Sequence, residues 1–232
     1  MDETKPARRP RSDKGTIQAT ERDRELINWI AEQYAIRLDQ LAQLIGASEH
    51  AARRLMQRWK TAGWAEGRVL IAREEPWIWI TRRGQADMGA GFRHWEPTLA
   101  RLAHIRSVNA VRMQREARRP EGIWTSERTL LQAQGSAQRA AREQGTTRPT
   151  AQHLADAEWR KSPEDELTAI EVEQSYKGTE RTRMIMLHLI QVQHYPKVAY
   201  FTIPTIKPHL EAITAGHPDL AARVRVYLIS DE

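Results

Sequence analysis

The stretch LTAIEVEQSYKG, residues 167–178, combines the pattern of a buried strand with three charged side chains. Side chains alternate between the two faces of a strand, so Ile170 and Val172 share one face while Glu171 and Glu173 share the other. Carboxylates on one face repel each other, and burying one without a partner is costly. The stretch therefore predicts a buried strand that carries an acidic site on one face.

A preceding segment supplies a third carboxylate. Residues 151–161, AQHLADAEWRK, are expected to pair with residues 166–174 as a hairpin, which brings Asp156 close to Glu171 and Glu173. A divalent cation relieves the repulsion between converging carboxylates, and their hard oxygen atoms suit Mg²⁺. We therefore expect these three residues to be the metal ligands of a catalytic site.

Lys177 follows the strand and is expected to belong to the same catalytic site. Its ammonium group could polarise the scissile phosphate or orient the attacking water in metal-assisted cleavage of a phosphodiester. A second interpretation stays open, in which Glu171 and Glu173 pair with Arg181 or Arg183 of the next helix. The first interpretation predicts a Mg²⁺-dependent DNA nuclease, and the second predicts a structural cluster.

Helix and strand patterns alternate around this hairpin. A long amphipathic helix is expected over residues 98–120, followed by a short strand at 122–127 and by a loop or surface helix over 128–149. After the hairpin, the patterns predict a helix at 179–193, a strand at 197–204, a helix at 206–216 and a strand at 222–230. Crossover helices impose some parallel pairing, so this order predicts an α/β sandwich with a mixed sheet.

The N-terminal third has a different organisation, in which three helices precede a hairpin. Thr20 and Asp23 form a capping-box pattern at the start of the first helix, and Gly46 is placed to end the second. Ser48 is placed to cap a third helix, whose apolar positions recur at helical spacing. Two apolar strands follow, at residues 64–72 and 76–82. Three helices and a hairpin in this order predict a winged helix-turn-helix.

Basic and amide side chains mark the surface of this unit that is expected to bind duplex DNA. On the outward face of the third helix they are Arg53, Arg54, Gln57, Arg58 and Lys60, and on the hairpin they are Arg68 and Arg73. The alternative is an ordinary solvated helix face. Trp77 and Trp79, at alternate positions of the second strand, are expected in the core, although a protein-binding winged helix would use them as anchors for a partner.

The composition favours a polyanionic partner. The 232 residues carry a net charge of +6, which favours association with nucleic acid. The chain contains no cysteine, which excludes disulfides, thiolate zinc sites and cysteine nucleophiles. No apolar run is long enough for a membrane span and no signal peptide is evident, so a cytoplasmic protein without a membrane partner is expected. Residues 1–18 are expected to form a basic arm, either disordered or in contact with phosphates.

The acidic motif also supports a resemblance to known proteins. His153 and Asp156, followed by Glu171, Glu173 and Lys177, resemble the H…D and E-V-E…K segments of the replication-relaxation family. Members of that family, found on actinobacterial plasmids and other mobile elements, pair a winged helix with a PD-(D/E)xK nuclease-like domain. The resemblance extends from about residue 20 to the end of the chain. Further family-like positions are Arg181, Arg183 and Tyr195, and Gln191 forms with Tyr195 a QxxxY pattern that some nuclease-like helices carry.

This sequence departs from the nuclease pattern at the lysine. Where the superfamily has a lysine two residues after the acidic residue, the chain has Glu173, so Lys177 has to act as a displaced substitute. No proline precedes Asp156. The resemblance implies a role in the replication, transfer or regulation of a mobile element, with replication or conjugation proteins as further partners.

Together these observations predict an α+β protein. Its domains are a basic arm over residues 1–18, a winged helix over 19–92 and a restriction-endonuclease-like sandwich over 97–232. Three functions remain open: a DNA-binding protein or transcriptional regulator that needs no cofactor, a Mg²⁺-dependent endonuclease, and an adaptor that recruits other proteins. A homodimer is consistent with the first, because helix-turn-helix proteins often bind palindromic sites.

Overall fold

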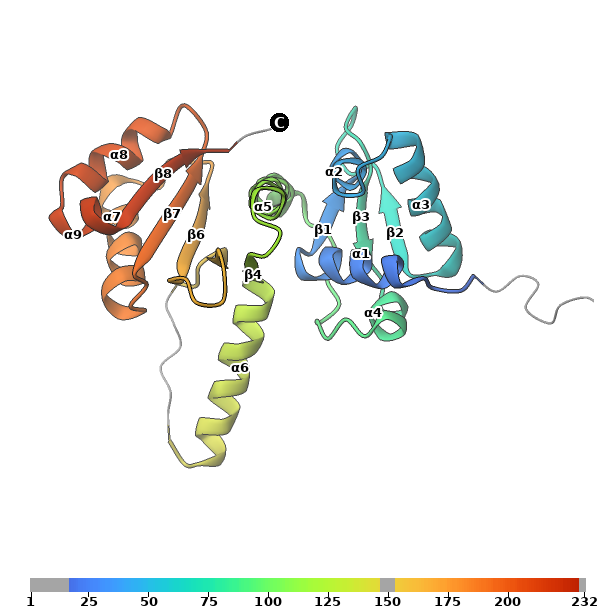
Figure 1. Cartoon of the computed structure of the whole chain (residues 1–232), viewed down its shortest axis with the longest axis horizontal. Helices are drawn as coiled ribbons and strands as arrows, with labels where there is room; N and C mark the ends of the chain where they lie inside the picture. Colours follow the sequence, from blue (N-terminus) through green and yellow to red (C-terminus); the bar gives the residue numbers. More distant parts are fainter. Residues whose placement is uncertain (1–16, 147–152, 230–232) are drawn as a thin grey trace, which may run out of the picture.

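The computed structural model describes residues 17–146 and 153–229. Two α/β parts lie on either side of the long helix α5 (Leu99–Arg118), which is seen end-on in Figure 1. The N-terminal part consists of α1 (Glu21–Glu32), β1 (Ala35–Arg37), α2 (Leu38–Leu44), α3 (Glu49–Ala62), β2 (Ala65–Arg68), β3 (Trp77–Ile80) and α4 (Arg82–Met88). The C-terminal part consists of β4 (Ile123–Ser126), α6 (Glu127–Glu143), β5 (Ala157–Arg160), β6 (Thr168–Glu173), α7 (Thr179–Leu187), η1 (His188–Val192), β7 (Lys197–Thr202), α8 (Lys207–Ala215), α9 (Pro218–Arg223) and β8 (Val224–Leu228). The predicted α+β class is confirmed.

Local signals place the first three helices where the sequence predicts them. The side chain of Thr20 caps α1 in a capping box with Asp23, and the side chain of Ser48 accepts a hydrogen bond from the backbone N–H of Ala51 in α3. Between α2 and α3 the chain turns at Gly46, whose φ of 62° lies in the left-handed region that favours glycine. The three helices and their connections are confirmed.

The N-terminal sheet has three antiparallel strands in the order β1–β3–β2. The predicted hairpin is confirmed, with Ala65 opposite Ile80 and Arg68 opposite Trp77. β1, which the sequence did not predict, pairs with the edge of β3 opposite to β2. This strand has three residues and follows Tyr34, whose φ is 70°, so it is too short to show an alternating pattern.

Both faces of the N-terminal sheet are covered. Ile78 and Ile80 belong to the core formed with α1, α2 and α3, whereas Trp77 and Trp79 point to the opposite face and pack with Leu102 of α5. Both tryptophans are buried, as predicted for core residues. The face of the sheet that carries them is closed by the chain's own α5.

The C-terminal sheet has five strands in the order β4–β5–β6–β7–β8. β4, β5 and β6 are antiparallel neighbours, while β6, β7 and β8 run parallel. The helices that connect the parallel strands pack on one face, and α5 packs on the other. The predicted β5–β6 hairpin and the mixed sheet are both confirmed.

Of the two alternatives for residues 128–149, a loop or a surface helix, the structure shows the helix: it forms α6, which projects from the body of the molecule (Figure 1). Other elements differ from those that the sequence predicts. The helix predicted over 179–193 changes at His188 from α-helical α7 to the π-helical turn η1, and α9 was not predicted. The proposed basic arm lies outside the described residues, apart from Ile17 and Gln18. Within the described ranges, no helix combines the length and the apolar character needed to cross a membrane.

Candidate functional site

Glu171 and Glu173 lie on the face of β6 that is covered by the α7 and α8 layer. Their neighbour Ala169 belongs to the core of that layer, while Ile170 and Val172 face α5, as the alternation predicts. Glu171 is 4% exposed and Glu173 is 5% exposed. These carboxylates therefore need partners within the protein.

The partner of Glu171 is His153. The ring atom Nε2 of His153 lies 2.9 Å from Oε1 of Glu171. Burial raises the pKa of Glu171 to about 7, the nearby charge of Asp156 contributes in the same direction, and the contact with His153 opposes it. The same contact raises the pKa of His153. The two groups form a titratable pair in which a proton is held near neutral pH.

Asp156 is held by two groups from different elements. Its Oδ1 lies 3.0 Å from Nε2 of His104 on α5, and its Oδ2 accepts a hydrogen bond of 2.7 Å from the backbone N–H of Val172 on β6. Burial lowers the pKa of His104, but the contact with Asp156 outweighs that effect and raises it above its usual value. Asp156 thereby links the start of β5 to α5 and to the acidic strand.

Glu173 is engaged by the residues that follow it. Its Oε1 accepts hydrogen bonds of 3.0 Å from both the backbone N–H and the hydroxyl of Ser175, and its Oε2 lies 2.6 Å from Nζ of Lys177. Thr202 of β7 donates a hydrogen bond of 2.6 Å to the backbone carbonyl of Glu173. Lys177 therefore approaches the end of the strand, as expected, but as the ion-pair partner of Glu173.

The structure brings Asp156 and Glu171 near each other and pairs Glu173 with Lys177, but Oε1 of Glu171 is already engaged by His153. Among the described residues, no three His, Asp or Glu side chains are arranged as a group of metal ligands. Asp156 has a partner on each oxygen, as does Glu173. In this arrangement the carboxylates do not fit a Mg²⁺ ion, and we derive no catalytic step through one.

The second interpretation expected Glu171 and Glu173 to pair with Arg181 or Arg183, but in the structure both glutamates have other partners. Arg183 pairs with Glu180 at the start of its own helix, and the recorded ion pairs of Glu171 and Glu173 are with His153 and Lys177. Sequence reasoning missed His104 altogether, because it lies 52 residues before Asp156 on a helix whose own pattern carries no signal of the contact.

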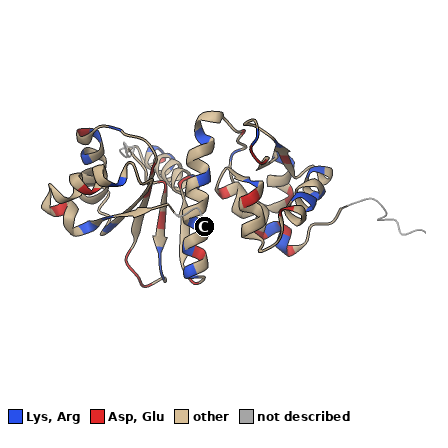
Figure 2. Ribbon diagram, turned by 90° about the horizontal axis from the view of Figure 1, so that it is seen from above, with Lys and Arg blue, Asp and Glu red and all other residues tan. Residues whose placement is uncertain are grey.

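The residues of α3 and the hairpin that are expected to bind DNA fall into two groups, those that contact other residues of the protein and those that are exposed and have no ion pair within the described residues. Four of them make contacts within the protein: Arg53 with Glu75, Arg58 with Asp23, Lys60 with the carbonyl of Gly67, and Arg68 with Glu66. Arg54, Gln57 and Arg73 are exposed, and no ion pair involves either arginine within the described parts of the chain. Basic and acidic residues are interspersed along the helices of both parts (Figure 2). A DNA-binding surface therefore has to be argued from individual basic residues and not from a continuous basic face.

Arg58 has a structural role in addition to the predicted one. It pairs with the buried carboxylate of Asp23, which also accepts a hydrogen bond of 2.8 Å from Nε1 of Trp59. A hollow beside this pair is lined by the start of α1, the end of α2 and the exposed side of α3, and it includes Arg22 and Arg54. Arg22 donates a hydrogen bond of 3.1 Å to the carbonyl of Ile45, whereas Arg54 has no ion pair within the described residues, so Arg54 is the unpaired arginine that lines this concave surface.

Comparison of the chain with models of known protein families, with curated proteins and with solved structures found no match in any of the three.

Proposed function

We propose that this chain is a duplex-DNA-binding protein whose N-terminal part acts as a winged helix-turn-helix. The observation that carries the proposal is the pair Arg54 and Gln57. These residues lie three positions apart in the middle of α3, so they share one helix face, and both are exposed. Arginine and glutamine are side chains that recognise guanine and adenine edges in the major groove.

The surrounding elements support this geometry. α3 begins one short turn after α2 and buries Ala52 and Trp59 against the core, which fixes the direction of its exposed face. The β2–β3 hairpin lies beside it, and its connection carries the exposed Arg73 with a φ of 67°. In the proposed complex α3 enters the major groove and Arg73 and Arg68 contact the flanking phosphates or the minor groove.

For the ion-paired residues of α3 we propose a secondary role in DNA binding. Arg53 is exposed and Glu75 is half-buried, and ion pairs that remain accessible to solvent contribute little to stability, so DNA phosphate competes readily for Arg53. Arg58 pairs with Asp23, and Lys60 donates a hydrogen bond to the carbonyl of Gly67. These contacts hold α3 in place and fix the positions of its two positive charges. Neither cofactor nor metal is needed for this mode of binding.

For the C-terminal part we propose a nuclease-like fold that serves as a scaffold. The antiparallel strands β4, β5 and β6, with α6 inserted between β4 and β5, are followed by a helix and the parallel strand β7. Apart from α6 this is the order expected of a PD-(D/E)xK core, with Asp156 before β5 and Glu171 on β6. The engaged carboxylate oxygens favour a role in stability over catalysis. By the same resemblance we propose a role in the replication, transfer or regulation of a mobile element, as a regulator or as an adaptor for replication or conjugation proteins.

DNA binding is tested by fluorescence anisotropy with duplex DNA over a series of salt concentrations. Arg54→Gln is expected to weaken binding by about tenfold at every salt concentration, because it removes a side chain proposed to contact base edges. Arg139→Gln removes the same charge from the projecting helix α6 and is the matched control. Equal losses in both variants would show that only the net charge matters and would overturn the assignment to α3.

Nuclease activity is tested by nicking of supercoiled plasmid and cleavage of single-stranded DNA with Mg²⁺, with Mn²⁺ and with chelator. The wild-type protein is compared with a variant that carries both Glu171→Ala and Glu173→Ala. We expect no metal-dependent nicking by the wild-type protein while DNA binding is intact. Nicking that requires the metal and is lost in the double variant would establish the acidic strand as an active site and overturn the scaffold proposal.

A further inference from the structure

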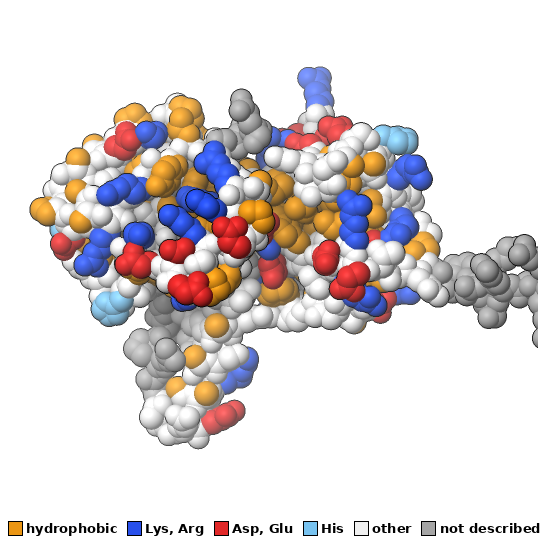
Figure 3. Space-filling model, viewed as in Figure 1, with side chains coloured by type: hydrophobic (Ala, Val, Ile, Leu, Met, Phe, Trp, Pro, Cys, Tyr) orange, Lys and Arg blue, Asp and Glu red, His pale blue; other side chains and the backbone are white. Residues whose placement is uncertain are grey.

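A cavity of about 290 Å³ lies on the sheet face opposite the carboxylates, between β7, β8 and the C-terminal end of α5. Its lining includes five cationic side chains and two acidic ones. They are Arg115, Lys161, Lys197, Arg223 and Arg225, with Asp165 and Glu166. Figure 3 shows basic side chains gathered over this region of the surface. The excess of positive charge in a concave site favours an anionic ligand.

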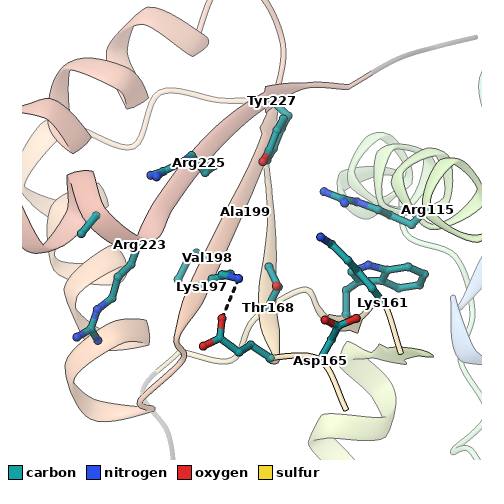
Figure 4. A pocket seen from close by; sticks show the side chains of 13 residues that line it. Arg115, Lys161, Asp165, Thr168, Lys197, Val198, Ala199, Arg223, Arg225 and Tyr227 are labelled. Atoms are coloured by element: carbon teal, nitrogen blue, oxygen red, sulfur yellow. Dashed lines mark ion pairs between the residues drawn. The ribbon is translucent and has the colours of Figure 1, made fainter. Parts of the chain in front are cut away.

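Two of these cations point into the cavity. Figure 4 shows the charged ends of Arg115 and Lys161 directed toward the space in front of Tyr227 and Ala199. The side chains of Arg223 and Arg225 point away from that space in the same view. Lys197 is neutralised by Glu166 at 2.8 Å, and no ion pair of Arg115 or Lys161 occurs within the described residues. Arg115 and Lys161 are therefore the cations available to a ligand.

The walls of the cavity also carry buried N–H donors without acceptors. Nε1 of Trp159 and Nε of Arg115 are buried and have no hydrogen-bond partner among the described residues, and Trp159 is only 2% exposed. A buried donor without a partner costs free energy, so an acceptor supplied by a ligand would stabilise this site. Burial lowers the pKa of Arg115, in keeping with a guanidinium that lacks an anionic neighbour.

The aromatic side of the cavity suits a planar group. The rings of Phe201 and Tyr227 stack with centroids 5.4 Å apart, and the Arg115 guanidinium lies 5.0 Å from the first centroid and 5.7 Å from the second. Tyr227 remains 43% exposed, so part of its ring is open to a ligand. Aromatic rings and arginine together are the groups on which proteins stack nucleic-acid bases.

We propose that this cavity binds one nucleotide unit, with its phosphate held by Arg115 and Lys161 beside Trp159 and its base on Tyr227. The ligand is either a free mononucleotide or the phosphorylated end of a single strand, which share this chemistry. The site lies across the sheet from the acidic cluster and is separate from α3, so it does not rest on the proposed recognition of duplex DNA.

The experiment follows the NMR signals of the indole N–H groups while dAMP is added to the full-length protein at low ionic strength. The chain has eight tryptophans, and Trp159→Phe identifies the signal of Trp159 while keeping an aromatic ring. We expect a saturable shift of this signal. Arg115→Gln and Lys161→Gln are each expected to weaken binding by about tenfold or more, because each removes a charge-assisted hydrogen bond.

Matched controls separate the site from general charge effects. Arg223→Gln removes the same charge at the cavity wall and is expected to leave the affinity for dAMP unchanged. A short single strand with a terminal phosphate, compared with the same strand without it, distinguishes a strand end from a free nucleotide. Stronger, Arg115-dependent binding of the phosphorylated strand supports the strand end, and preference for dAMP supports the free nucleotide.

Three outcomes would overturn the proposal. The first is the absence of a saturable shift of the Trp159 signal. The second is equal weakening by Arg223→Gln and Arg115→Gln, which would show non-specific attraction. The third is equal affinity for inorganic phosphate and dAMP, because the base would then make no contact. Unchanged indole spectra of the free variants confirm that each one is folded, so a loss of binding can be assigned to the substituted side chain.

Discussion

A single side chain, Asp23, holds together the first and third helices of the N-terminal part. Its carboxylate accepts a hydrogen bond of 2.8 Å from the backbone N–H of Thr20, bonds to Nε1 of Trp59 and pairs with Arg58. Burial raises the pKa of Asp23, but these donors outweigh that effect and lower it. The sequence predicts the capping box but not the two contacts with α3, because they depend on how the helices pack.

We predict that Asp23→Ala destabilises the protein by about 3 kcal/mol, because it removes the cap and leaves Arg58 and the indole of Trp59 without their buried partner. Chemical denaturation followed by tryptophan fluorescence measures this change. Glu21→Ala is the control, since Glu21 lies in the same turn but is exposed and pairs with Arg24. A loss of similar size in both variants would contradict the role assigned to the buried carboxylate.

At the scale of the element, β6 shows what a sequence pattern can and cannot determine. Alternation along the strand predicts which side chains share a face, and the structure confirms it for Glu171 and Glu173. Whether the face is open, metal-bound or paired depends on His104 of α5 and His153 before β5, which the strand's own sequence does not specify. For the same reason the exposed face of α3 could be predicted, while the ion pairs that occupy part of it could not.

The acidic cluster predicts a pH dependence of stability with a definite sign. The folded pKa of Glu171, about 7, is above its ordinary value of 4.5, and those of His153 and His104 are above 6.5. The folded state therefore binds protons more strongly than the unfolded chain. The stabilisation is complete below the unfolded pKa values and is lost as the pH rises through the folded ones. We predict that Tm falls as the pH rises from about 4.5 through about 7 because of Glu171, and that the two histidines continue the fall above pH 6.5.

The variant that tests this dependence is Glu171→Gln, which removes the titrating carboxylate and keeps an oxygen for His153. Thermal unfolding at a series of pH values is expected to show a smaller fall in Tm than in the wild-type protein. The remaining groups that face this position are Asp156, Lys177 and Tyr200, and they are unchanged in the variant. Glu164→Gln on the exposed β5–β6 connection is the control, and an identical slope in all three proteins would refute the assignment.

At the scale of the whole molecule, α5 is shared by the two sheets. Leu102 and Ile105 pack against the N-terminal sheet, while Val108 and Val111 pack against the C-terminal one. These residues recur at every third position, and at 3.6 residues per turn each step of three shifts the direction by about 60°. The apolar stripe therefore winds around the helix by about half a turn from Leu102 to Val111. A stripe of this kind is suited to covering two partners on different sides.

Polar contacts reinforce the connection between the two parts. Arg112 is buried on α5 and pairs with Glu32 of α1 at 2.7 Å and with Glu116 of its own helix at 2.7 Å. Asn109 donates a hydrogen bond of 2.9 Å to the carbonyl of Ala35. Because the guanidinium of Arg112 is buried and would lose its anionic partners, these contacts oppose separation of α5 from the N-terminal part. We infer that the N-terminal sheet and the C-terminal sheet unfold together.

This inference predicts the outcome of hydrogen exchange in two variants of α5. Leu102→Ala, in the half of α5 that faces the N-terminal sheet, is expected to cost about 3 kcal/mol, and Val111→Ala, in the half that faces the C-terminal sheet, about 2 kcal/mol. In a cooperative molecule each variant lowers the protection of the slowest-exchanging amides in both β3 and β7. Leu99→Ala is the control, because Leu99 is exposed at the start of the same helix. If Leu102→Ala affected only β3 and Val111→Ala only β7, the two parts would be independent folding units, and α5 would be a linker between them.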